Sequence, residues 1–126
     1  MTSTSLPQTL ILNARLKQRI AIDQILYLEG EINYTSFHFQ SRKRTVIAHP
    51  LKHFEADLLP WGFLRIHRSY IVNSRFVKSA NLLENTLTLM DGTVLRVARR
   101  RVKELELFRF RDKIILNNIE NNYSST

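Results

Sequence analysis

Cysteine is absent from this chain of 126 residues, and glycine and proline occur only three times each. Without cysteine the chain has no disulfide scaffold, no thiolate metal site, no iron–sulfur cluster and no thiol nucleophile. So few glycines and prolines exclude collagen-like and proline-rich low-complexity proteins. A single domain of this length can bury a core without cross-links, and the lack of cysteine fits a reducing compartment.

Long apolar segments are missing as well. The longest uninterrupted apolar runs have three or four residues, whereas a membrane-spanning helix needs about 20. Residues 1–9 lack the basic start and the apolar stretch of a secretory signal. The sequence therefore predicts a soluble, cytoplasmic protein with no membrane partner, and a flexible N-terminal segment over residues 1–9.

Acidic side chains are outnumbered, with 11 Asp and Glu against 19 Lys and Arg, which gives a net charge of +8 and a pI near 10.3. Most of the excess lies in residues 64–126, which carry +6, while residues 1–63 carry +2. Such a concentration favours a polyanionic partner, because neutralising phosphates releases counterions and drives association. A basic protein without such a partner stays open as an alternative.

Short apolar runs and alternating patterns predict short β-strands along much of the chain. Thr35, Phe37 and Phe39 alternate with polar residues, which is typical of a half-buried strand. A charged turn at residues 41–44 then leads into the second strand of a hairpin. Further strands are expected at residues 10–12, 20–22, 25–28, 45–48, 63–66 and 70–72.

The strongest hairpin signal is the pair Asp91-Gly92, which lies between alternating runs at residues 86–90 and 93–97. This pair is typical of a tight turn in which both central residues have positive φ.

Two segments have helical periodicity instead. Residues 50–59 place apolar side chains at i, i+3 and i+7 behind Pro50, which predicts a short amphipathic helix that covers a sheet. From Arg99 onward the pattern is helical again, so we expect a C-terminal helical extension with a polar tail over residues 108–126.

Patterns for catalysis or metal binding are not found. His49 and His53 are four residues apart, but Pro50 starts a helix between them and no third ligand is near in sequence. No nucleophile elbow surrounds Ser69, and the glycines form no phosphate-binding loop. The sequence therefore predicts a protein that is not an enzyme and that holds no cofactor or metal.

Two basic clusters are the candidate functional segments. Residues 65–70 combine two arginines, a histidine, a serine and a tyrosine around an interrupted strand, and residues 96–103 hold five cations. The guanidinium group of arginine can bind a phosphate or form two hydrogen bonds with O6 and N7 of guanine. A merely solvated charged face is the competing interpretation of residues 99–103.

Four blocks of the sequence resemble, in order, the LytTR DNA-binding domain family of bacterial response regulators. Residues 27–34 look like its "Y-x-E-a-x-x-N-Y" opening, and residues 51–58 are similar to its "L-k-x-l-e-x-x-L" helix. Residues 63–73 resemble its "F-x-R-i-H-R-S-y-i-V-N" block almost letter for letter, and residues 91–100 resemble its closing "d-G-x-x-l-p-v-S-R-r". The resemblance covers a domain over residues 10–107.

The resemblance implies a mainly β, elongated fold of about ten short strands with one short helix near residues 50–59. In this family, loops from the sheets enter successive major grooves of double-stranded DNA and contact the minor groove between them. By position, Arg68, Arg100 and the tip of the loop that holds Tyr34 would contact bases. Ser69 and Arg99 would contact phosphates, and His67 would brace the Arg68 loop. The expected DNA-binding residues are Tyr34, His67, Arg68, Ser69, Arg99, Arg100, Arg101 and Lys103.

Two departures from the family qualify this expectation. Ala98-Arg99 replaces the family's closing Ser-Arg, so one hydroxyl that could bond a phosphate is missing. The loss of this single neutral hydrogen bond would weaken the phosphate contact by about 1 kcal/mol. Family members are often fused to a receiver or sensor, for which this chain has no length, so a separate sensor or receiver protein is a candidate partner. The apolar residues of 108–126 could pack on the domain or on a second subunit, and an exposed apolar face of that size would favour a homodimer.

Two other functions compete with sequence-specific transcriptional regulation. One is nonspecific or RNA binding, which aromatic stacking platforms would support. The other is a protein-interaction or dimerisation module that works through residues 108–126.

Overall fold

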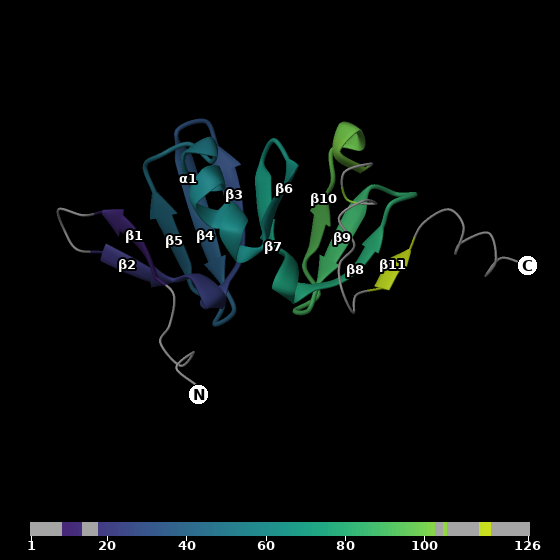
Figure 1. Ribbon diagram of the computed structural model, residues 1–126, viewed down its shortest axis with the longest axis horizontal. Coiled ribbons are helices and arrows are strands. Elements are labelled where there is room, and N and C mark those ends of the chain that lie inside the picture. The colour runs from purple at the N-terminus through teal and green to yellow at the C-terminus, as the bar shows by residue number, and fades with distance from the viewer. Residues whose placement is uncertain (1–8, 14–17, 103–104, 106–113, 117–126) are drawn as a thin grey trace, which may run out of the picture.

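The computed structural model describes residues 9–13, 18–102, 105 and 114–116. Within this part of the chain, eleven strands form three sheets, together with one α-helix and four 3-10 helices. Figure 1 shows the sheets following one another along an elongated molecule, from the β1–β2 hairpin at one end to β11 at the other. The prediction of a mainly β fold with one short central helix is confirmed.

The central sheet has the strand order β5-β4-β3-β7-β6, and all neighbours in it are antiparallel. Its strands are β3 (Ile25–Glu31), β4 (Tyr34–Phe39), β5 (Arg44–Ile47), β6 (Phe63–His67) and β7 (Tyr70–Asn73). The small sheet at one end pairs β1 (Thr9–Asn13) with β2 (Gln18–Ala21).

The third sheet has the order β10-β9-β8-β11. Its strands are β8 (Val77–Asn81), β9 (Thr86–Leu89), β10 (Val94–Arg96) and β11 (Ile114–Leu116). The 3-10 helices are η2 (Ile22–Gln24), η3 (Leu59–Trp61), η4 (Ser74–Phe76) and η5 (Arg99–Arg101). A 3-10 turn of three residues therefore begins at Arg99, where the sequence predicts the start of a helix.

The helix predicted over residues 50–59 is present as α1 (Lys52–Leu58), which η3 continues until Gly62 ends it with a φ of 87°. Phe54 and Leu58 face the central sheet and are buried there. The ring of Phe54 meets that of Phe37 edge to face at 4.9 Å. This core explains the alternation in β4, because Thr35 and Phe37 point toward α1 and are fully buried.

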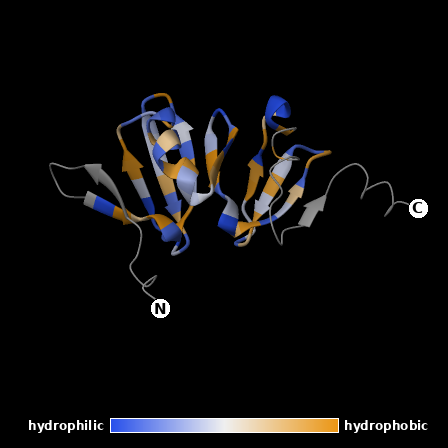
Figure 2. Ribbon diagram, viewed as in Figure 1, coloured by the Kyte–Doolittle hydropathy of each residue, from blue (hydrophilic) through white to orange (hydrophobic). Residues whose placement is uncertain are grey.

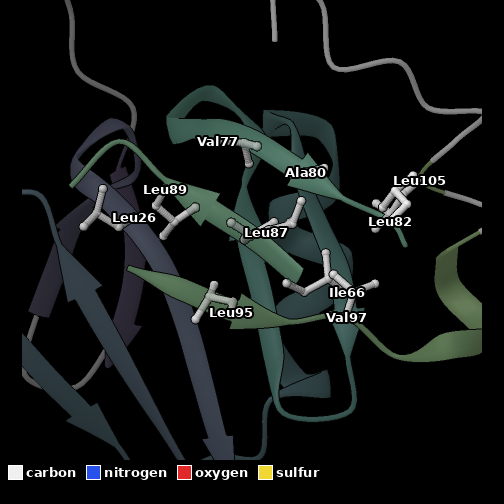
Figure 3. Close-up of a cluster of buried hydrophobic side chains, with 11 residues drawn as sticks. Leu26, Ile66, Val77, Ala80, Leu82, Leu87, Leu89, Leu95, Val97 and Leu105 are labelled. Carbon is white, nitrogen blue, oxygen red and sulfur yellow. The ribbon is translucent and has the colours of Figure 1, made fainter. Parts of the chain in front are cut away.

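A second core lies between the central sheet and the third sheet (Figure 3). Leu26, Ile66 and Val72 come from the central sheet, and they pack with Leu87, Leu89, Leu95 and Val97 of the third sheet and its end. A backbone hydrogen bond from the Ala98 amide to the Ile66 carbonyl, 2.8 Å long, joins the two sheets directly. The two sheets therefore share one core, which fixes the position of η5 relative to β6.

The Asp91-Gly92 hairpin is present between β9 and β10, but its turn differs from the one expected. Only Gly92 has a positive φ, of 94°, whereas Asp91 does not. The Gly92 amide bonds to the Leu89 carbonyl and the Leu89 amide to the Thr93 carbonyl, which is a three-residue loop with one left-handed residue. Asp91 instead caps the turn by accepting a hydrogen bond from the Thr93 amide.

The β4–β5 turn has the same hydrogen bonds, from the Arg42 amide to the Phe39 carbonyl and from the Phe39 amide to the Lys43 carbonyl. Here Arg42 occupies the left-handed position with a φ of 73°. A residue with a Cβ atom is strained in that conformation by roughly 1–2 kcal/mol.

Arg42→Gly is therefore expected to raise the free energy of unfolding by about 0.5–1 kcal/mol, since relief of this strain exceeds the entropy cost of glycine. Urea unfolding at high salt measures the change with little contribution from the lost charge. Gly92→Ala is the matched control and should destabilise, because an added Cβ there meets no atom within 4 Å and only the backbone is strained. Equal stability of Arg42→Gly and the parent would contradict the claim that the backbone of Arg42 is strained.

The prediction of a C-terminal helix over residues 108–126 is wrong at Ile114–Leu116, which form β11 and pair in parallel with β8. The apolar run satisfies helical and strand periodicity alike, and pairing with a strand 35 residues earlier, Ile114 opposite Ser79, decides between them. The other residues of 108–126 lie outside the described residues.

Candidate nucleic-acid interface

Three connections meet at one edge of the molecule. β3 and β6 are both antiparallel to β7, so the turns that follow β3 and β6 lie at the same edge of the central sheet. Figure 1 shows the β3–β4 turn, the β6–β7 turn and η5 along the upper side of the view. The Gly30 amide donates a 2.8 Å hydrogen bond to the Ser69 carbonyl, which ties the first two connections together.

The arginines of this edge are available for a ligand. Arg68, Arg99 and Arg100 are exposed, and within the part of the chain that the structure describes the only ion pairs join other residues. In Figure 2, η5 and the β6–β7 turn are hydrophilic against the mixed pattern of the strands. The structure therefore brings Arg68 and Arg100 to the same side of the β scaffold, although they are 32 residues apart in sequence.

The β6–β7 turn is held by side chains of β6. His67 Nδ1 accepts a 3.0 Å hydrogen bond from the Ser69 amide, so His67 braces the turn as expected. Arg65 Nε and Nη2 donate to the carbonyls of His67 and Arg68, at 2.7 and 2.6 Å. Arg65, which the sequence groups with the exposed cations, is thus an internal residue with a side chain only 14% exposed.

His67 is neutral in this arrangement. Burial lowers the pKa of His67 below the ordinary value of 6.5, and the nearby cations Arg68, Arg96 and Arg65 lower it further. The hydrogen bond from the Ser69 amide requires an unprotonated Nδ1, so the proton of the neutral ring is on Nε2. Protonation would therefore break the brace and add a cation beside three others.

Acid is expected to destabilise the chain through His67. The unfolded chain takes up this proton near pH 6.5 while the folded chain resists it, so the contribution of His67 to stability is complete above pH 6.5 and is lost as the pH falls below that value. Urea unfolding at pH 7.5 and 5.5 should show a larger loss in the parent than in His67→Gln. Parallel pH profiles of the two proteins would contradict this role.

The β3–β4 turn presents mainly Ile32 and Tyr34. Ile32, at the tip, is 89% exposed, and Tyr34, the first residue of β4, is 53% exposed. Ile32 shares a shallow concavity with Lys52 of α1, Arg68 and Ser69. The sequence does not single out Ile32 or Lys52, because their place beside Arg68 depends on how α1 packs on the sheet.

The remaining predicted site residues differ in accessibility. Arg101 is half-buried, and its Nη1 lies 3.4 Å from the Arg65 carbonyl oxygen. Arg96, which belongs to the second basic cluster but is not among the expected DNA-binding residues, is exposed at the end of β10 and lines a second concavity with His67 and Ser69. Lys103 is outside the described residues.

A separate polar cluster lies on the central sheet. The rings of Tyr27 and His38 stack at 4.3 Å, and His38 Nε2 is 3.1 Å from Glu29 Oε1. Burial lowers the pKa of His38, whereas burial and the Glu29 carboxylate raise the pKa of Tyr27 to about 12. Tyr27 is therefore uncharged near neutral pH, and burial disfavours a charged His38.

His49 and His53, the two histidines spaced four residues apart, stack their rings on each other at 4.2 Å. No third ligand joins them, since among the described residues no group of three or more His, Cys, Asp or Glu side chains could hold a metal ion. The same residues contain no helix of the length and apolarity that a membrane span requires.

Comparison with solved structures supports the fold. The structure resembles the LytTr DNA-binding domain of a protein described as a methyl-accepting/DNA response regulator from Bacillus cereus, with a TM-score of 0.63 and 22% identity. The similarity covers 71% of this chain and 84% of that domain.

Curated relatives include the transcriptional regulatory protein LytR of Staphylococcus aureus strains N315 and NCTC 8325, each 32% identical over 75 residues. The match covers 57% of this chain and 30% of each relative, so the chain corresponds to under a third of those proteins. The family description "LytTr DNA-binding domain" matches residues 17–109, which include β2 to β10 and η5. The chain belongs to the LytTr DNA-binding domain family.

Proposed function

We propose that this chain binds specific sites on double-stranded DNA and thereby regulates transcription. The observation that carries the proposal is the edge formed by the β3–β4 turn, the β6–β7 turn and η5, from which Arg68, Arg99 and Arg100 project without ion pairs among the described residues. The family is defined by DNA binding and not by a reaction, which supports the prediction that the chain is not an enzyme.

The chemistry of the exposed side chains suits both affinity and base recognition. An arginine that donates two hydrogen bonds to O6 and N7 of guanine discriminates by about 1–3 kcal/mol against another base. We assign this role in the major groove to Arg68 and Arg100. Ser69 and Arg99 lie next to them in sequence and are assigned to phosphates, which fix the register of the protein on the duplex.

The β3–β4 turn is the third contact in this proposal. Its tip carries the apolar Ile32 beside Tyr34, and an apolar side chain in the major groove can contact the methyl group of thymine. Arg101 and Lys103 follow Arg100 along the chain and would add phosphate contacts. Each phosphate contact strengthens binding to every sequence alike and steepens the salt dependence.

Duplex DNA fits the distribution of aromatic side chains better than single-stranded RNA does. Phe37, Phe54 and Phe63 are buried in the core, so they cannot serve as platforms on which unpaired bases stack. Transcriptional regulation is the activity named for the LytR relatives. A homodimer and a separate sensor or receiver protein complete the proposal as partners.

Selection of bound duplexes from a random pool tests the proposal. We expect an enriched sequence with at least one guanine whose replacement weakens binding, and an affinity that falls steeply with salt. Competition with single-stranded RNA of the same length is the control. Failure to enrich any sequence, or equal competition by RNA, would contradict sequence-specific duplex binding.

A further inference from the structure

We infer that Arg65 is a positioning residue for DNA recognition, and that Glu55 of α1 fixes Arg65 in this role. Arg65 sets the conformation of the β6–β7 turn that presents Arg68 and Ser69, and α1 is thereby coupled to the interface. The inference rests on the proposed function, but it is argued from internal contacts of the protein.

All three nitrogens of the Arg65 guanidinium form hydrogen bonds, two of them to the β6–β7 turn and one to α1. Nε donates to the His67 carbonyl at 2.7 Å, Nη2 donates to the Arg68 carbonyl at 2.6 Å, and Nη1 meets Glu55 Oε1 at 2.8 Å. Arg65 lies opposite Ile71, on the face of the sheet that α1 covers. Its guanidinium thus lies between Glu55 of α1 and the carbonyls of His67 and Arg68.

The turn needs this support because the strand ladder is irregular where it begins. The register of β6 against β7 shifts between Arg65 and His67, so two residues of β6 stand opposite one step of β7. A bulge of this kind interrupts the regular ladder hydrogen bonds. The planar guanidinium bonds both carbonyls of the turn in one geometry, which the single ammonium group of a lysine cannot reproduce.

Glu55 keeps the guanidinium in place by charge as well as by hydrogen bonding. The two charged groups are 2.8 Å apart, and the Glu55 side chain is 39% exposed while that of Arg65 is 14% exposed. Without the carboxylate, Arg65 would lose one of its three anchors and the carbonyls of the turn would be held less firmly. A movement of α1 would have the same effect, so α1 is a place where a partner could alter DNA recognition.

The decisive comparison is Glu55→Gln against Asp57→Asn. Both changes remove one negative charge from α1, so both raise attraction to phosphates equally. Asp57 is exposed and outside the interface. We expect Asp57→Asn to bind the selected duplex at least as tightly as the parent, and Glu55→Gln to bind it about 3- to 10-fold more weakly. On unrelated duplex the two variants should bind alike, and no more weakly than the parent.

A double-mutant cycle with Arg68→Ala tests whether the effect acts through Arg68. In the Arg68→Ala background, Glu55→Gln should cost less than about 2-fold, because the side chain that it positions is gone. Arg65→Lys should weaken specific binding more than Glu55→Gln does. Additive losses, an equal loss on unrelated duplex, or a Glu55→Gln variant that behaves like Asp57→Asn would each overturn the inference.

Hydrogen exchange in the free protein separates this inference from the proposed function. The Ser69 amide, which is bonded to His67 Nδ1 within the turn, should exchange about 3- to 10-fold faster in Glu55→Gln than in Asp57→Asn, whether or not DNA is bound specifically. Unchanged exchange overturns the positioning role even if the parent selects a DNA sequence. Faster exchange without sequence selection would contradict only the proposed function.

Discussion

Replacing Arg68 and Arg100 together by alanine is expected to weaken binding to the selected duplex by roughly 30-fold to 25,000-fold, since each loss is worth about 1–3 kcal/mol. The two side chains come from separate elements of the same edge, the β6–β7 turn and η5. Each single variant should also relax the base preference at one position, and the two positions should differ. Titration of fluorescent duplexes that carry all four bases at each position measures both effects.

The control for this experiment removes two cations elsewhere. Lys43→Ala with Lys78→Ala lowers the net charge by the same amount at exposed positions, one in the β4–β5 turn and one in β8. This control should lose little affinity and no base preference, because long-range attraction is screened beyond about 10 Å at 0.1 M salt. Equal losses in the two double variants would mean that net charge, and not the proposed contacts, governs binding.

Phe37→Ala is expected to lower the free energy of unfolding by about 3–5 kcal/mol. Phe37 is fully buried between the central sheet and α1, in edge-to-face contact with Phe54. Its removal leaves a cavity under α1 that the surrounding side chains fill only in part. A loss of this size is a large fraction of the roughly 5–15 kcal/mol that stabilises a typical domain.

Urea unfolding followed by circular dichroism measures this loss. Val46→Ala is the control, because Val46 in β5 is 49% exposed and its replacement should change stability by at most about 0.5 kcal/mol. If Phe37→Ala cost no more than Val46→Ala, the core between α1 and the central sheet would be looser than the packing indicates.

Local patterns in the sequence were sufficient for most elements. The alternation over Thr35, Phe37 and Phe39, the apolar spacing in residues 50–59 and the Asp91-Gly92 pair each depend on interactions within a few residues. The structure has β4, α1 and the β9–β10 hairpin at these positions. The turn at Asp91 was less predictable, since loops of two and three residues use the same residue types.

Structure that depends on interactions between distant residues could not be predicted from such local patterns. Ile114–Leu116 form a strand because β8 offers an edge for parallel pairing, and nothing in the apolar run itself specifies that edge. Ile32 and Lys52 come to lie beside Arg68 through the packing of α1 and the β3–β4 turn. Their sequence neighbours give no sign of this.

By itself, the sequence determined the short strands, the central helix, the excess of basic residues and the family-like block at residues 63–73. Each of these depends only on residue types and on spacing within a short segment. Only the tertiary structure decided which of the arginines in the family-like block is exposed and which is held by internal contacts. Arg65 and Arg68 are three residues apart, yet the bulge in β6 directs Arg65 toward Glu55 and leaves Arg68 exposed. Arg100 joins Arg68 because two sheets share one core, and such contacts between remote segments depend on packing that no local pattern contains.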